Sequence, residues 1–194
     1  MFNEKANSAD SMTAGLVAKT GFGESAKGGG VFHVQCFDKD GVLKWEDQMH
    51  NLVVNVGLQD MNTKYFTGST YTASFFLGLI TGPGSSTTYA AADTLASHAG
   101  WTELVPGTDY TGNRKAVTFG TATTADPSVI SNSASASSFA MLVNGTVVAG
   151  ALLASVSSGT SGILFSAGDF TGGDKTVDNG DTLNVTYSFS LDAA

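Results

Sequence analysis

The chain has 194 residues, which suits one domain, or one domain with an arm, and is long enough to bury a hydrophobic core without disulfides or metals. Only 13% of its residues are charged and its formal net charge is −8, so we expect a largely neutral surface and no nucleic-acid partner. The single Cys36 excludes an intrachain disulfide.

Residues 1–30 form a polar leader that ends in GESAKGGG, and two interpretations of it stay open. The first is a flexible terminus, and the second is an extended arm that becomes ordered on a partner surface. The leader has no basic start followed by an apolar run, and no stretch approaches the roughly 20 apolar residues of a membrane span. We therefore expect synthesis in the cytoplasm and no membrane partner. As an arm, the leader would contact its partner through its large apolar residues: Phe2, Met12, Leu16, Val17 and Phe22.

The body, residues 31–194, is predicted to open with a β-hairpin. VFHVQCF at 31–37 and VLKWEDQ at 42–48 flank the sequence DKDG, whose Asp and Gly residues favour a turn. Every second residue of the first strand is apolar, and Cys36 is one of them. A buried structural thiol is therefore expected rather than a nucleophile.

A helix is predicted after this hairpin, because apolar residues recur at helical spacing: Val54, Leu58, Met61 and Tyr65. Asn51 is the expected N-cap and Gly68 the stop. TASFFLGLITGPG then indicates a buried strand with a Gly-Pro-Gly turn, and YAAADTLASHAG at 89–100 predicts a second short helix.

Short β-like segments follow from residue 114 onward, separated by turns of Gly, Asn, Ser and Asp: RKAVTFGTAT, ASSFAMLVNG, TVVAGALLAS and GILFSAG. Asn144-Gly145 between two apolar runs is the strongest hairpin signal. The prediction is a mainly β fold, a β-sandwich or jelly-roll-like body with one or two short helices and an extended N-terminal arm.

The last strand has two contrasting faces. One face is apolar and is expected to join a core: Leu183, Val185, Tyr187, Phe189 and Leu191. The other face has small polar residues and no charge: Asn184, Thr186, Ser188 and Ser190. Because a solvent-facing strand usually carries charges, we expect these residues to be covered by a neighbouring copy of the chain.

Residues suited to catalysis are few. The three histidines show no metal-binding spacing, and neither a G-x-S-x-G elbow nor a P-loop occurs. An Asp/Gly-rich segment, residues 168–181, contains carboxylates that would suit calcium, although Asp and Gly are also ordinary turn residues: Asp169, Asp174, Asp178 and Asp181. We expect no enzyme activity, no cofactor and no metal.

Several segments together resemble a group of structural proteins of tailed bacteriophages. They are VFHVQCFDKDGVLKWEDQMHNLVVNVGLQDM, ASFFLGLITGPG, AAADTLASHAGWTEL, LFSAGDF and GDTLNVTYSFSL, and they cover most of residues 31–191. Capsid decoration (cement) proteins are the most similar group. These are small β-rich modules on the outer shell, often trimeric, with an N-terminal arm that latches onto the neighbouring shell protein. The resemblance therefore implies a capsid-exterior protein whose partners are the major capsid protein and itself, as a homotrimer.

A tail or head-fibre component that binds a host-surface glycan is the alternative, because such proteins share the β-rich, low-charge composition. Trp101 and Tyr110 are its candidate aromatic platform, since aromatic faces stack on sugars. The predicted helix and the absence of a fibrous repeat argue against a fibre. A hydrolase acting on the cell envelope is a third class, for which the sequence offers no acid and nucleophile constellation.

Overall fold

The computed structural model describes residues 26–67, 74–82 and 87–193. Antiparallel strands dominate these ranges, together with one helix, α1 (Asn55–Phe66). The prediction of a mainly β, sandwich-like body is confirmed. No helix within these ranges is long and apolar enough to cross a membrane.

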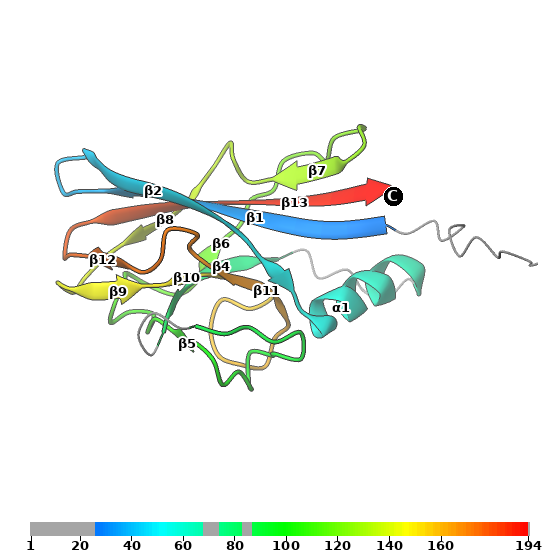
Figure 1. Ribbon diagram of the computed structural model, residues 1–194, viewed down its shortest axis with the longest axis horizontal. Helices are drawn as coiled ribbons and strands as arrows, with labels where there is room; N and C mark the ends of the chain where they lie inside the picture. Colours follow the sequence, from blue (N-terminus) through cyan, green and yellow to red (C-terminus); the bar gives the residue numbers. More distant parts are fainter. Residues whose placement is uncertain (1–25, 68–73, 83–86, 194) are drawn as a thin grey trace, which may run out of the picture.

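The first layer of the body, which we call the outer sheet, is built around β1 and β13. These two strands pair antiparallel along their whole length and lie side by side in Figure 1. β2 continues the sheet beyond β1, while β7 and β8 both pair with the far side of β13. The strand bounds are β1 (Ala26–Phe37), β2 (Leu43–His50), β7 (Ser128–Ser131), β8 (Ser137–Ala140) and β13 (Thr182–Ala193).

The second layer, the central sheet, has the order β3-β11-β10-β4-β5, with β6 also paired to β4. Its strands are β3 (Leu52–Val53), β4 (Phe76–Thr81), β5 (Thr102–Glu103), β6 (Lys115–Ala116), β10 (Gly150–Ala154) and β11 (Leu164–Asp169). A separate two-stranded ladder joins β9 (Thr146–Val148) to β12 (Lys175–Val177).

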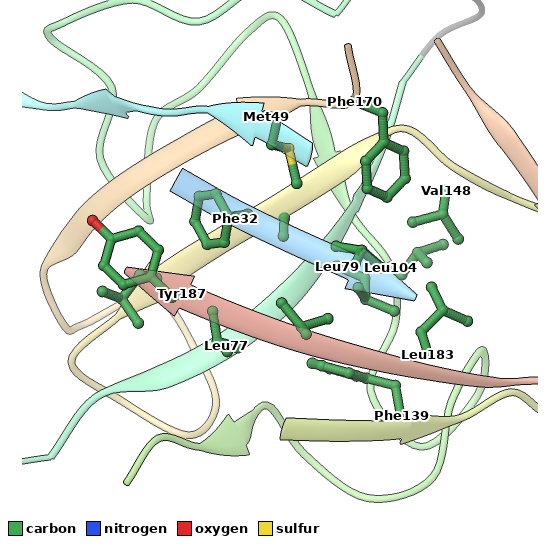
Figure 2. Close-up of a cluster of buried hydrophobic side chains, with 14 of the residues drawn as sticks. Phe32, Met49, Leu77, Leu79, Leu104, Phe139, Val148, Phe170, Leu183 and Tyr187 are labelled. Carbon is green, nitrogen blue, oxygen red and sulfur yellow. The ribbon is translucent and has the colours of Figure 1, made fainter. Parts of the chain in front are cut away.

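The main hydrophobic core lies between the two sheets. Figure 2 shows side chains of β1, β4 and β13 pointing toward one another, among them Phe32, Leu77 and Tyr187. The predicted apolar face of β13 is buried from Leu183 to Phe189, whereas Leu191 is 40% exposed. Cys36 is buried in the same core, as predicted.

A second core covers the opposite face of the central sheet. Three residues of this sheet pack there: Ile80, Leu152 and Leu164. They contact Val54, and also Leu95 and Trp101 from the segment that leads into β5. The central strands β4, β10 and β11 are therefore buried on both faces, as is usual for a middle layer. The outer sheet, by contrast, packs its inner face on the core and leaves the other open.

The predicted β-hairpin is confirmed, because β2 folds back on β1 through a turn in which Gly41 has a φ of 79°. The Asp38 carboxylate accepts hydrogen bonds from the amides of Asp40 and Val42 and closes this turn. β1 begins at Ala26, earlier than the predicted strand and inside the predicted arm.

Helix α1 forms where the sequence predicts it, but only half of its predicted apolar stripe packs on a core: Val54 is buried and Met61 packs against the main core. Leu58 is 44% and Tyr65 82% exposed. Close packing occurs instead at Gly57, where an added Cβ would lie 2.5 Å from the carbonyl oxygen of Phe165. The glycine lets the helix backbone approach β11 directly.

The predicted N-cap is not observed. The N-cap position is occupied by Val54, without a side-chain hydrogen bond. Asn51 instead donates from Nδ2 to the Tyr187 hydroxyl at 3.0 Å, and so joins the two sheets. Gly68 lies outside the described residues.

The second predicted helix, 89–100, is wrong, because this segment forms turns and an isolated bridge between Thr94 and Ser97. The Asp93 carboxylate accepts hydrogen bonds from the Ala90 amide and from Trp101 Nε1, both at 3.0 Å. These contacts close the chain into a loop that buries Trp101, and tertiary burial outweighs the helix propensity of the alanines.

The hairpin predicted at Asn144-Gly145 is also wrong, although the turn itself forms, with a φ of 69° at Gly145. β8, before the turn, pairs with β13, whereas β9, after it, pairs with β12. The turn therefore directs the chain from the outer sheet to the two-stranded ladder.

Gly30 is the position in β1 where a side chain is least tolerable. An added Cβ would lie 2.3 Å from the Tyr187 hydroxyl and 2.7 Å from Asn51 Oδ1, whereas nothing lies within 4 Å of a Cβ at Gly29. We expect Gly30→Ala to lower the free energy of unfolding by about 2 kcal/mol, because it displaces the hydrogen-bonded pair. Gly29→Ala should be neutral or slightly stabilising, since alanine suits a strand better. Urea denaturation measures both, and equal effects of the two variants would contradict this account.

Candidate interaction surface

The four uncharged residues of β13 lie on the open side of the outer sheet. Asn184, Thr186, Ser188 and Ser190 alternate with the buried core residues of the same strand, and all four are partly exposed. β13 is the central strand, hydrogen-bonded to β1 on one side and to β7 and β8 on the other. Its polar residues therefore lie in the middle of a broad surface.

Strand register determines which residues accompany them, because directly opposed residues of antiparallel strands share a face. Thr186 lies opposite His33, for example, and His33 lies opposite Gln48. We call the middle of this surface the outer face: Gly29, Val31, His33, Gln35, Glu46, Gln48, His50, Val129, Ser131, Ser138, Asn184, Thr186, Ser188 and Ser190. The same face continues at one end with Lys27 opposite Asp192, and at the other end with Phe37, Thr182 and Ala140.

The outer face offers hydrogen-bonding groups with almost no charge. Within these fourteen residues Glu46 carries the single carboxylate, and there is neither Lys nor Arg; the bordering Lys27 and Asp192 carry opposite charges. Ser188 Oγ donates to Ser131 Oγ at 2.9 Å, and Gln35 Nε2 donates to the Glu46 carboxylate at 3.1 Å. Hydroxyl and amide groups of this kind can bond to another neutral surface at little desolvation cost.

The aromatic platform expected for glycan binding is not present at Trp101 and Tyr110. Trp101 is 3% exposed, with its indole N–H bound to Asp93 and its ring stacked on His98 at 3.6 Å between centroids. Tyr110 is fully buried and packs edge-on against Phe139. Neither ring presents a face to a sugar.

The acidic residues of 168–181 do not form one cluster, because Asp178 and Asp181 both face the Lys44 ammonium whereas Asp169 binds elsewhere. Asp169 accepts hydrogen bonds from Tyr89 and Thr87, and Asp181 is paired with Lys44 at 2.6 Å. Asp178 accepts a hydrogen bond from the Gly145 amide. Within the described ranges, no three His, Cys, Asp or Glu side chains form a group that could hold a metal ion. The calcium interpretation therefore has no geometric basis.

The predicted arm contacts cannot be placed on this surface, because Phe2, Met12, Leu16, Val17 and Phe22 lie outside the described residues.

Three exposed apolar side chains that the sequence did not predict lie at the end of the sandwich where several turns meet. Val105, Leu142 and Val143 are 40–54% exposed. The Leu142 amide bonds to the Asp109 carbonyl and the Gly180 amide to the Met141 carbonyl, so the turns containing these residues are neighbours. The available signal was a large apolar residue beside Gly, Pro or Asn in a turn sequence, as in VPG and VNG.

Comparisons with known proteins give no match to a family model, to a curated protein or to a solved structure.

The thiol of Cys36 is a nucleophilic group that the main core encloses completely. Burial, reinforced by the nearby Asp181 carboxylate, raises the pKa of its thiol from 9.0 to about 11. The Sγ atom lies 4.0 Å from an Asp181 oxygen.

We therefore expect alkylation of Cys36 at pH 8.5 to be slower by roughly 100-fold or more in the folded protein than in urea, because the raised pKa reduces the thiolate by about that factor and the enclosing core also excludes the reagent. In the folded protein the rate should keep rising between pH 9 and 11, as the thiol titrates. Mass spectrometry of iodoacetamide-treated samples measures both rates. Equal rates in buffer and in urea would show a solvent-open thiol.

Proposed function

We propose that this chain is a non-enzymatic structural protein of a tailed-bacteriophage virion, a capsid decoration (cement) protein on the outer surface of the major capsid shell. Its partners in this proposal are the major capsid protein and further copies of itself, in a homotrimer. The segment resemblance supports the virion assignment, and the outer face supports the assembly role.

The open outer face, whose fourteen residues include one carboxylate and neither Lys nor Arg, is the observation on which the proposal depends. A chain with a formal net charge of −8 repels its own copies. The outer face carries one carboxylate among its fourteen residues, so two copies meet there with little repulsion. The central sheet has no comparable surface, because both of its faces are covered.

The proposed mechanism is mass action. A protein that binds the assembled shell but not its dissociated subunits lowers the free energy of the assembled state. Multiple copies joined through the outer face would bind several capsid subunits at once, and this raises the effective concentration of each contact. In this proposal, residues 2–22 supply the tether to the shell.

The alternative, a tail or head-fibre component that binds a host surface, has lost its candidate residues, because Trp101 and Tyr110 are buried. Copy number separates the two functions. Quantitative mass spectrometry of the purified particle should give a number of copies close to that of the major capsid protein. A handful of copies per particle would exclude a cement role and favour the tail.

Charging the outer face provides the second test. We expect Thr186→Lys/Ser188→Lys to weaken self-association by roughly a hundredfold or more, because unpaired charges buried in an interface cost several kcal/mol. The unfolding midpoint should change little, since both residues are partly exposed. Analytical ultracentrifugation and shell occupancy measure the effect.

Thr160→Lys/Ser161→Lys is the matched control, because it adds the same charge in an exposed loop outside the outer face. Normal assembly of the Thr186/Ser188 variant would contradict the proposed interface and show that the outer face is ordinary solvent-exposed surface.

A further inference from the structure

The turn between β8 and β9 contains an exposed Asn-Gly pair, Asn144-Gly145. β9 and β12 lie side by side (Figure 1), so this turn is next to the turn that follows β12, residues 178–181. Because Gly145 has no side chain, its backbone nitrogen is the least hindered kind for attack on the preceding side chain.

Two hydrogen bonds join these turns, and they involve the groups that would react at an Asn-Gly pair. The Gly145 amide donates to Asp178 Oδ1 at 3.0 Å, and Asn144 Oδ1 accepts from the Asn179 amide at 2.9 Å. One bond places a carboxylate on the proton of a backbone nitrogen. The other places a donor on the oxygen of the neighbouring side-chain amide.

We propose that Asn144 is a site of self-modification, at which Asp178 assists the loss of the side-chain amide through a cyclic succinimide. The Gly145 nitrogen is the nucleophile and the Asn144 side-chain carbonyl carbon is the electrophile. Asp178 serves as general base, and the Asn179 N–H stabilises the oxyanion that develops on Asn144 Oδ1. The carboxylate lies within hydrogen-bond reach of the proton that it removes.

The bonds balance with water as the only co-reactant. The bond from Gly145 N to Asn144 Cγ forms while the bond from Cγ to Nδ2 breaks. The amide proton passes to Asp178 and then to the departing nitrogen, which leaves as ammonia. Water opens the ring at either carbonyl and gives aspartate or isoaspartate at position 144, so Asp178 is regenerated.

A second Asn-Gly pair in the same chain, Asn179-Gly180, serves as an internal comparison. Its glycine amide donates to the Met141 backbone carbonyl at 3.1 Å, and a carbonyl is not a base. Both asparagines are exposed and both precede glycine. Two features separate them, the carboxylate at the Gly145 amide and the N–H donor at Asn144 Oδ1, so the modification is expected to be faster at Asn144.

The modification changes the surface on which it occurs. A new carboxylate at position 144 would adjoin Asp178 and the exposed apolar side chains of Leu142 and Val143. This end of the sandwich would thus gain negative charge with time. The inference is independent of the proposed virion role, since it rests on the two turns alone.

The test is incubation of the full-length protein at neutral pH, with peptide mapping and isoaspartate detection at both pairs over time. We expect faster conversion at Asn144 than at Asn179. Asp178→Ser keeps an oxygen but removes the carboxylate, and it should slow the conversion of Asn144 by roughly tenfold. This effect is smaller than the loss of roughly hundredfold or more that follows removal of a general base in an enzyme. Conversion at Asn179 should stay unchanged.

The same measurements in urea provide the control, because both pairs should then react at similar rates and Asp178→Ser should have little effect. Circular dichroism verifies that the variant is folded. Equal rates at the two pairs in the folded protein would overturn the proposal. A rate at Asn144 that is unchanged or increased by Asp178→Ser would also overturn it, since the hydrogen bonds would then only hold the turn.

Discussion

The pairing of β1 with β13 is the constraint on which the rest of the structure depends. The strands are hydrogen-bonded from the Ala26–Ala193 pair to the Phe37–Thr182 pair without a register shift. Because side chains alternate, a slip of one residue would turn the apolar face of β13 to solvent and its hydroxyl face to the core. This register therefore creates the main core and the outer face together, and neither could be changed without the other.

One buried side chain bridges the point on β13 where the neighbouring strand changes from β8 to β7. β8 pairs with β13 only up to Val185 and β7 only from Ser188, which leaves a gap between them. Asn132, fully buried, fills that gap: its Oδ1 accepts from the Tyr187 amide at 2.7 Å, and its Nδ2 donates to the Val185 carbonyl at 3.3 Å. The amide side chain thus replaces two ladder bonds that a continuous strand would supply, which avoids buried unpaired backbone groups.

Local patterns in the sequence predicted the elements whose environment is simple. The alternation in β1 and β13 gave their buried faces, because each strand has one face on the core and one open. The prediction failed where distant contacts decide the conformation: Asp93 and Trp101 hold 89–100 as a loop, and the turn at Asn144-Gly145 leads from the outer sheet to the two-stranded ladder. For the candidate surface, the β13 residues could be predicted, but companions such as Ser131 come from register, which no local pattern contains.

The edges of the outer sheet are protected against pairing with other strands, in contrast to its open face. β2 forms one edge and carries the charges of Lys44, Glu46 and Asp47, which discourage pairing with a foreign strand. At the other edge, the amides of Gly120 and Thr123 bond to the carbonyls of β7, so a loop covers it. The sheet is thus protected against edge-to-edge growth, while the open face between these edges carries few charges and has no such protection. In the proposed oligomer, association through that face would bury side-chain hydroxyls and amides and leave the backbone ladder intact, and a symmetric contact of this kind closes at a defined number of copies.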